Sequence, residues 1–283
     1  MINTWWFNLI IYLISYVIFT QAFKVVTKTS RKDGALTILL QFLGGVISLL
    51  FVPLFKLQFP SDIRTYIFLG LACIFYAITD RISTPARRGL EVSTFSILGQ
   101  LSTVFLITWG ILFFKEPIVL KKIIGSILIL SGNIFVLYKK GKFEINKYVI
   151  FSLLASLSLS IGLSIDVGIS DQFNIPFYVA TTLIVPSMLI LLIDKVKVRD
   201  VIDEFKLGNR KFILLVGLTW SILIISMLRS YQYGEVTTVA PLASVTTILN
   251  VFVAYFLLKE KDSLLRKVLA AIIVIVGIVL IKI

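Results

Sequence analysis

Long apolar stretches alternate along the whole chain with short charged segments. A helix of about 20 apolar residues crosses the hydrocarbon core of a bilayer, which is about 30 Å thick. The breaks combine charged residues with Gly or Pro, as in KTSRKDG, RRGLE and KKGKFEINK. The pattern predicts an all-α, polytopic membrane protein with ten spans at residues 5–25, 35–55, 64–84, 92–114, 119–138, 148–169, 176–194, 211–230, 236–258 and 264–282.

The last two spans of each half align without a gap when the sequence is shifted by 144 residues. The charged positions that match are Lys115 with Lys259, Glu116 with Glu260, and Glu91 with Glu235. Apolar identities are common in such a chain, but three matched charged positions are not. We therefore predict two repeats, 1–141 and 142–283, of five spans each, and an odd number inserts the second repeat upside down.

The composition also indicates an integral membrane protein. The chain is 58% hydrophobic and 15% charged, with a mean hydropathy of +0.99, whereas a soluble domain of 283 residues needs more polar surface. The net charge of +13 comes from Lys and Arg in the loops, where topology and lipid headgroups explain it, so no nucleic acid is expected. There is no His and Cys73 is the only cysteine, so neither a disulfide within the chain nor a His/Cys metal site is expected, nor any cofactor.

Two segments carry a family resemblance, ARRGLEVSTFSILGQLSTVFLITWGILFFKEP and SYQYGEVTTVAPLASVTTILNVFVAYFLLKE. They resemble the corresponding regions of the two repeats in the drug/metabolite transporter superfamily, in its ten-span EamA-type branch. The resemblance covers nearly the whole chain. It implies ten transmembrane helices as two inverted five-helix repeats, a location in the cell membrane, and a small-molecule substrate. A proline usual in that family is replaced here by Thr103 and Thr247.

The orientation of the chain in the membrane has two readings. Most Lys and Arg lie in loops opposite the two termini, and the positive-inside rule places those loops in the cytoplasm. The resemblance implies the reverse, because ten-span relatives usually have both termini inside.

Ionisable residues within the spans are the first candidates for a substrate site, because burying them without a partner is costly. Asp80 and Arg81 are adjacent and diverge by about 100° on a helix, so they are not expected to pair fully with each other. Lys24 and Asp166 occupy corresponding places in the two repeats, where opposite charges suit a zwitterionic or charged solute. The alternative is that both residues simply mark the ends of their spans.

Uncharged side chains extend the predicted substrate site. In the superfamily that the chain resembles, certain helix pairs surround the substrate cavity. The corresponding helices here carry Gln100, Trp109, Tyr231 and Gln232. Trp220 and Asn250 are further candidates, although an amide in lipid often bonds to a neighbouring helix instead.

Two further features have predicted structural roles. Glu116 and Glu260 are expected to cap free N–H groups at the turn after their spans, with direct substrate contact as the alternative. Small residues seven positions apart on the fifth and tenth spans predict close packing between the repeats; they are Gly125, Gly132, Ala270 and Gly277.

These observations predict a secondary active transporter of a small polar metabolite, such as an amino acid or a related charged compound, with export favoured. Protons are a candidate coupling ion, carried by Asp80 or Asp166. The alternatives are multidrug or toxic-solute efflux and a channel-like or uniport facilitator. An enzyme is not expected, because the sequence has no metal cluster and no nucleophile–base spacing.

Overall fold

The structure is a computed structural model that describes residues 4–113, 119–139, 142–143, 145–234, 239, 242–243, 245–260 and 263–282. Within these ranges the fold is helical, apart from a short antiparallel pair of β1 (Tyr138–Lys139) and β2 (Lys142–Phe143). Three charged positions of the predicted repeat, Lys115, Glu116 and Glu235, lie outside the described residues.

The first half of the chain contains helices that follow the predicted spans. They are α1 (Trp5–Thr29), α2 (Asp33–Leu49), the 3-10 helix η1 (Val52–Leu54), α3 (Ile63–Gly89), α4 (Val92–Gly99), α5 (Leu101–Phe113) and α6 (Leu120–Leu137). The fourth predicted span is thus interrupted at Gln100, between α4 and α5.

The second half of the chain is also built mainly from long helices. Its helices are α7 (Lys147–Ile169), the 3-10 helix η2 (Ser170–Gln172), α8 (Ile175–Ile193), α9 (Val198–Leu207), α10 (Arg210–Tyr233), α12 (Val245–Leu257) and α13 (Leu264–Lys282). Eight of the described helices are long and apolar enough to cross a membrane, and the apolar segments Val92–Phe105 and Val245–Leu257 are shorter. A polytopic helical membrane protein is therefore confirmed.

Helix α9 is an addition to the sequence analysis, which predicted no helix between the spans 176–194 and 211–230. The helix is too short and too charged to cross a bilayer, but it is amphipathic, and Val201 and Phe205 pack against the core. Near these residues, the buried carboxylate of Glu204 accepts hydrogen bonds from the backbone N–H groups of Arg31 (2.8 Å) and Lys32 (2.7 Å). It thereby satisfies N–H groups at the start of α2.

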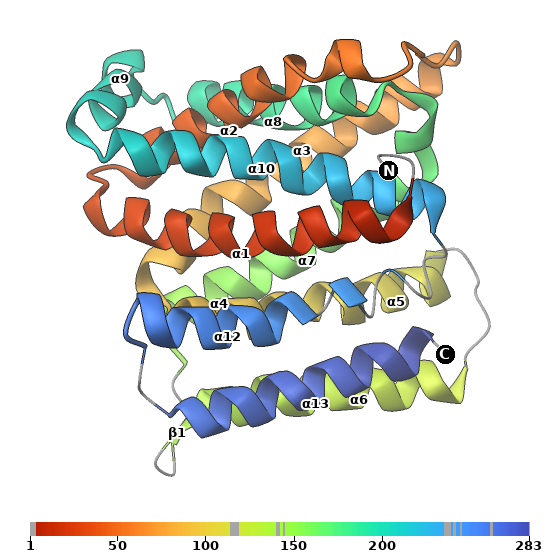
Figure 1. Cartoon of the computed structure of the whole chain (residues 1–283), viewed down its shortest axis with the longest axis vertical. Helices are drawn as coiled ribbons and strands as arrows, with labels where there is room; N and C mark the ends of the chain where they lie inside the picture. Colours follow the sequence, from red (N-terminus) through yellow and green to blue (C-terminus); the bar gives the residue numbers. More distant parts are fainter. Residues whose placement is uncertain are drawn as a thin grey trace.

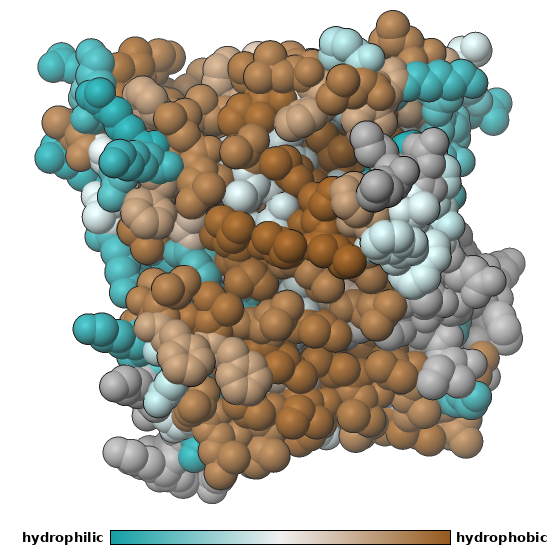
Figure 2. Space-filling view, viewed as in Figure 1, coloured by the Kyte–Doolittle hydropathy of each residue, from teal (hydrophilic) through white to brown (hydrophobic). Residues whose placement is uncertain are grey.

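The long helices run side by side across the molecule, with both ends of the chain at the same side (Figure 1). Helix α1 packs along α10, α3 along α7, α2 along α8, and α6 along α13. The face in Figure 2 has a broad hydrophobic band between hydrophilic groups at its left and right edges. A band of this kind lies in the hydrocarbon core, with the charged edges in the headgroup layers.

The predicted close packing of small residues between α6 and α13 is confirmed. A Cβ atom added to Gly277 would lie 2.6 Å from the carbonyl oxygen of Gly125, and one added to Gly132 would lie 3.0 Å from that of Ala270. The backbones therefore touch, so a larger side chain would force the two helices apart.

Candidate functional site

Arg87, on the last turn of α3, lies in an aromatic cage. Its guanidinium carbon is 5.1 Å from the ring centre of Phe19, 4.7 Å from that of Phe23 and 4.3 Å from that of Phe95. The side chain is only partly buried, and among the described residues it has no carboxylate at ion-pair distance and no acceptor for its Nε. Cation–π contacts stabilise this cation, but they leave its hydrogen-bond donors available.

Asp80 lies two turns before Arg87 on the same face of α3, because seven residues bring a helix back to nearly the same direction. Gln41 Nε2 of α2 donates a hydrogen bond of 2.7 Å to its Oδ2 atom. The neighbouring Arg81 points elsewhere and forms an ion pair with Asp194. The two adjacent residues therefore have separate partners, and only Asp80 lies on the face of Arg87.

A network of neutral side chains joins α1, α4 and α12 at Asn250, which is fully buried. Its Oδ1 atom accepts hydrogen bonds from Thr20 Oγ1 (2.6 Å) and Gln21 Nε2 (3.4 Å), and its Nδ2 atom donates to Ser96 Oγ (3.1 Å). Gln21 Oε1 has no partner among the described residues, so this network keeps one free acceptor.

Asp166 is buried near the end of α7, between two phenols. Tyr76 of α3 donates a hydrogen bond of 2.5 Å to Oδ2, and Tyr178 of α8 donates to Oδ1. No Lys or Arg of the described chain forms an ion pair with it, so its partners are all neutral.

Lys24, the predicted counterpart of Asp166, holds the end of α3. Its buried Nζ donates to the backbone carbonyl oxygens of Arg87 (2.7 Å), Arg88 (2.7 Å) and Leu90. A lysine at a helix C-terminus satisfies carbonyls that have no partner in the helix. With three acceptors already bound, these contacts favour a structural role for this cation.

Glu260 caps a helix, but the helix belongs to the other half of the chain. Its Oε1 atom accepts a hydrogen bond from Val92 N (2.7 Å), and Oε2 accepts from Ser93 N (3.3 Å) and Ser93 Oγ (2.8 Å), at the start of α4. Beside it, the buried Lys267 of α13 forms a 2.5 Å ion pair with Glu91. The turn between α3 and α4 is thus clamped by side chains from the second half.

The remaining candidates are spread over the bundle. Gln100 donates to Thr247 Oγ1 (3.0 Å) and Trp109 donates to Ser160 Oγ (2.8 Å), which are contacts between the halves. Trp220 lies in the buried core beside the ring of Phe19. Tyr231 is half-buried against Leu9 and Val239. Gln232 lies at the surface and accepts a hydrogen bond from Arg229.

Sequence reasoning missed Arg87 and the two phenols on Asp166. Arg87 was overlooked because RRGLE resembles an ordinary interfacial loop. The signal that identifies it is the spacing of Tyr76, Asp80 and Arg87, which puts all three on one face of α3.

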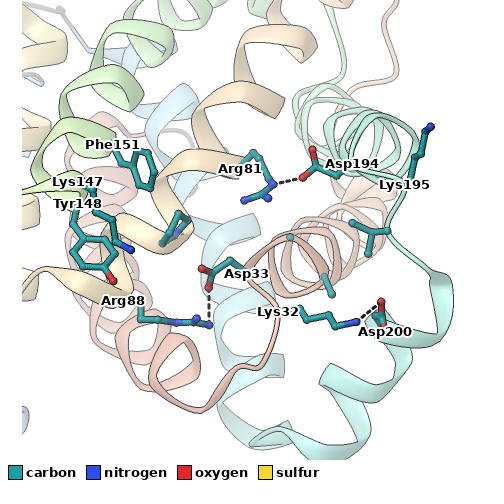
Figure 3. Close-up of a pocket in the computed structure, with 14 residues that line it drawn as sticks. Lys32, Asp33, Arg81, Arg88, Lys147, Tyr148, Phe151, Asp194, Lys195 and Asp200 are labelled. Atoms are coloured by element: carbon teal, nitrogen blue, oxygen red, sulfur yellow. Dashed lines mark hydrogen bonds and ion pairs between the residues drawn. The ribbon is translucent and has the colours of Figure 1, made fainter.

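A cleft of about 840 Å³ lies between the ends of helices rather than at the bundle centre (Figure 3). Lys32, Arg88 and Lys147 line it, and this side of the molecule is called the basic side below. The cleft contains Arg81, and its other lining residues are Lys32, Asp33, Gly34, Ala35, Pro85, Arg88, Lys147, Tyr148, Phe151, Asp194, Lys195, Val196 and Asp200. Residues of α1, α4, α10 and α12 are not among them. The cleft is therefore separate from the polar groups around Asn250 and Arg87.

Comparison with known families identifies the second half of the chain. Residues 146–283 match the model of the EamA-like transporter family. This half of the chain belongs to that family. The resemblance to the drug/metabolite transporter superfamily is thus confirmed, and the protein is a multi-pass membrane protein of a transporter family.

A solved structure shares its fold with nearly the whole chain. A solved crystal structure, described only as that of a protein, has a TM-score of 0.55 to this chain at 12% identity. The match covers 97% of this chain and 94% of that chain, and at this identity it shows the fold alone. No curated protein matches the chain significantly.

Proposed function

We propose that the protein is a secondary transporter that moves a small polar metabolite by alternating access in the cell membrane. In this proposal the halves 1–141 and 142–283 are inverted repeats of five spans each. The substrate carries a carboxylate or similar anion, as an amino acid does, and export is the favoured direction.

The packing of the helices supports the inverted repeats. In this proposal α1 corresponds to α7, α2 to α8, α3 to α10, α5 to α12 and α6 to α13. When each helix is replaced by its counterpart, the α1–α10 contact becomes the α7–α3 contact. The same exchange turns the α5–α7 contact into the α12–α1 contact, while the α2–α8 and α6–α13 pairs are each converted into themselves. A two-fold axis between the repeats produces this pattern, and such an axis in the membrane plane is typical of transporters with inverted repeats.

Arg87 is the residue that indicates the class of substrate. A guanidinium packed among phenyl rings without a carboxylate partner is costly unless water or an anionic ligand reaches it. Its five donors match a carboxylate in geometry, and its cage of three phenyl rings favours the cation while leaving those donors free.

Asp80 is the proposed partner for the cationic end of the substrate. Two helical turns separate its Cα from that of Arg87 by about 10 Å. Helical side chains lean toward the N-terminus, so the long Arg87 side chain approaches the level of Asp80. Gln100 and Asn250 are then positioned to contact the substrate between the halves, and Asp80 or Asp166 is a candidate carrier of the coupling proton.

Alternating access requires that each side of the bundle close in turn. The bonds of Glu260 and Lys267 to the α3–α4 turn join the two halves at the side of the molecule where α3 ends. We infer that they close this side in the present conformation, and that transport breaks some of them.

Counterflow in proteoliposomes tests the proposal with a panel of labelled amino acids and related anions. Arg87→Met removes the cation but keeps an apolar side chain for the phenyl rings, and it is expected to lower counterflow by roughly 30-fold or more. Arg87→Lys keeps the charge without the fork and should retain part of the activity. Arg199→Gln is the matched control, because its side chain is 89% exposed on α9.

The outcomes separate the proposal from its alternatives. A carrier saturates and shows counterflow, whereas a channel does neither. Full counterflow in a monodisperse Arg87→Met variant would contradict the assignment of Arg87 to the site.

A further inference from the structure

The cleft at the basic side has an excess of positive charge. Five of its lining residues are cations and three are carboxylates. Each carboxylate is neutralised by a cation of the same wall: Asp33 by Arg88 (2.6 Å), Asp200 by Lys32 (2.8 Å), and Asp194 by Arg81. The excess charge therefore comes from Lys147 and Lys195.

Lys147 is the cation that faces the open space of the cleft. Its amino group points inward in Figure 3, whereas Lys195 points away from the cleft. Its Nζ lies 5.1 Å from the ring centre of Tyr148, and no carboxylate of the described chain forms an ion pair with it. An anion entering the cleft would thus meet an ammonium group whose charge is uncompensated.

The position of the cleft matches the headgroup layer of a bilayer. Lys32 directly precedes α2, Arg88 is next to the last residue of α3, and Lys147 is the first residue of α7. All three helices are long and apolar enough to cross a membrane, so the cleft lies where their apolar spans end. Anionic lipid phosphates concentrate at this depth, and basic pockets between helix ends bind them.

The cleft also has apolar groups in its walls. Phe151 lies one turn inside Lys147 on the same face of α7, and Pro85 lies between Arg81 and Arg88 on one face of α3. A lipid can therefore place its phosphate at Lys147 and its glycerol and first acyl carbons against Phe151 and Pro85. A free phosphate ion would use only the charged part of this surface.

We propose that this cleft is a binding site for the phosphate headgroup of an anionic phospholipid, with Lys147 as the principal contact to the phosphate. The site is separate from the proposed substrate site, and the proposal does not depend on the transport function.

Native mass spectrometry of the purified full chain tests it by titration with dioctanoyl phosphatidylglycerol and dioctanoyl phosphatidylcholine. The wild type is expected to bind the phosphatidylglycerol more tightly. Lys147→Gln should weaken that binding about fivefold, which is the effect of one basic residue at a lipid surface, and should leave phosphatidylcholine unchanged. Lys147→Arg should retain the affinity of the wild type.

The matched control is Lys211→Gln, an exposed lysine at the start of α10 outside the cleft. It should bind like the wild type, and an equal loss in this variant would overturn the proposal in favour of general surface charge. Equal affinity of the wild type for the two lipids would also overturn it. Displacement of phosphatidylglycerol by an equal concentration of inorganic phosphate would assign the site to a free anion instead of a lipid.

Discussion

Glu260 offers the sharpest test of how the two halves are held together. Its carboxylate accepts three hydrogen bonds from Val92 and Ser93, at the start of a helix that lies more than 160 residues away in the chain. Glu260→Gln keeps one acceptor for Val92 N, removes the negative charge from the helix N-terminus and directs an amide donor at Ser93 N. A lost charge-assisted bond costs about 1.5–3 kcal/mol, so we expect the free energy of unfolding to fall by about 2 kcal/mol.

The loss can be measured as a shift in thermal unfolding of the purified protein in detergent. At about 2–4 °C per kcal/mol, the expected decrease in Tm is roughly 4–8 °C. A double-mutant cycle with Ser93→Ala should give a coupling energy of about 1 kcal/mol, because the two side chains share a 2.8 Å hydrogen bond.

Asp203→Asn is the matched control for removal of a carboxylate. Asp203 faces Arg199 at 3.9 Å, with side chains that are 45% and 89% exposed, so its loss should change stability by less than about 0.5 kcal/mol. Additive effects of the Glu260 and Ser93 substitutions, or an equal loss in the control, would refute the reasoning.

Two further predictions concern packing and helix ends. Gly277→Ala, whose Cβ would lie 2.6 Å from the carbonyl oxygen of Gly125, should lower the free energy of unfolding by about 1–3 kcal/mol. Gly70→Ala, whose Cβ meets nothing within 4 Å, should not lower it, and equal melting curves would contradict the packing argument. Lys24→Met should lower the Tm by several degrees because three carbonyls lose their donor. The control Lys28→Met changes an exposed lysine one turn further along α1 and should leave the Tm unchanged. Equal melting curves for the two variants would assign the capping of α3 to other groups.

The spans were predictable because the signal is local. The lengths of the apolar stretches and the charged breaks between them predicted α1, α3, α7 and α10, and most ends of these helices lie within a few residues of the predicted ones. The amphipathic helix α9 was missed because its charged residues dominate a hydropathy reading, although Val201 and Phe205 follow a helical period.

The candidate site was predicted less well, because its chemistry depends on partners far apart in the chain. Asp80 and Asp166 were singled out because they are ionisable residues within predicted spans, but nothing near Lys24 in sequence indicates the three carbonyls that it binds. Arg87 became a candidate only when Phe19 and Phe23 of α1 and Phe95 of α4 were found around it.

The sequence by itself determined that this chain crosses the membrane many times and that small residues line one helix pair. These properties follow from hydrophobic length and residue spacing, which act within a single helix. Only the tertiary structure decided which helix Glu260 caps and which cation stays without a carboxylate. Hydrogen bonds and ion pairs have ranges of a few ångströms, and packing between helices selects which groups come within that range.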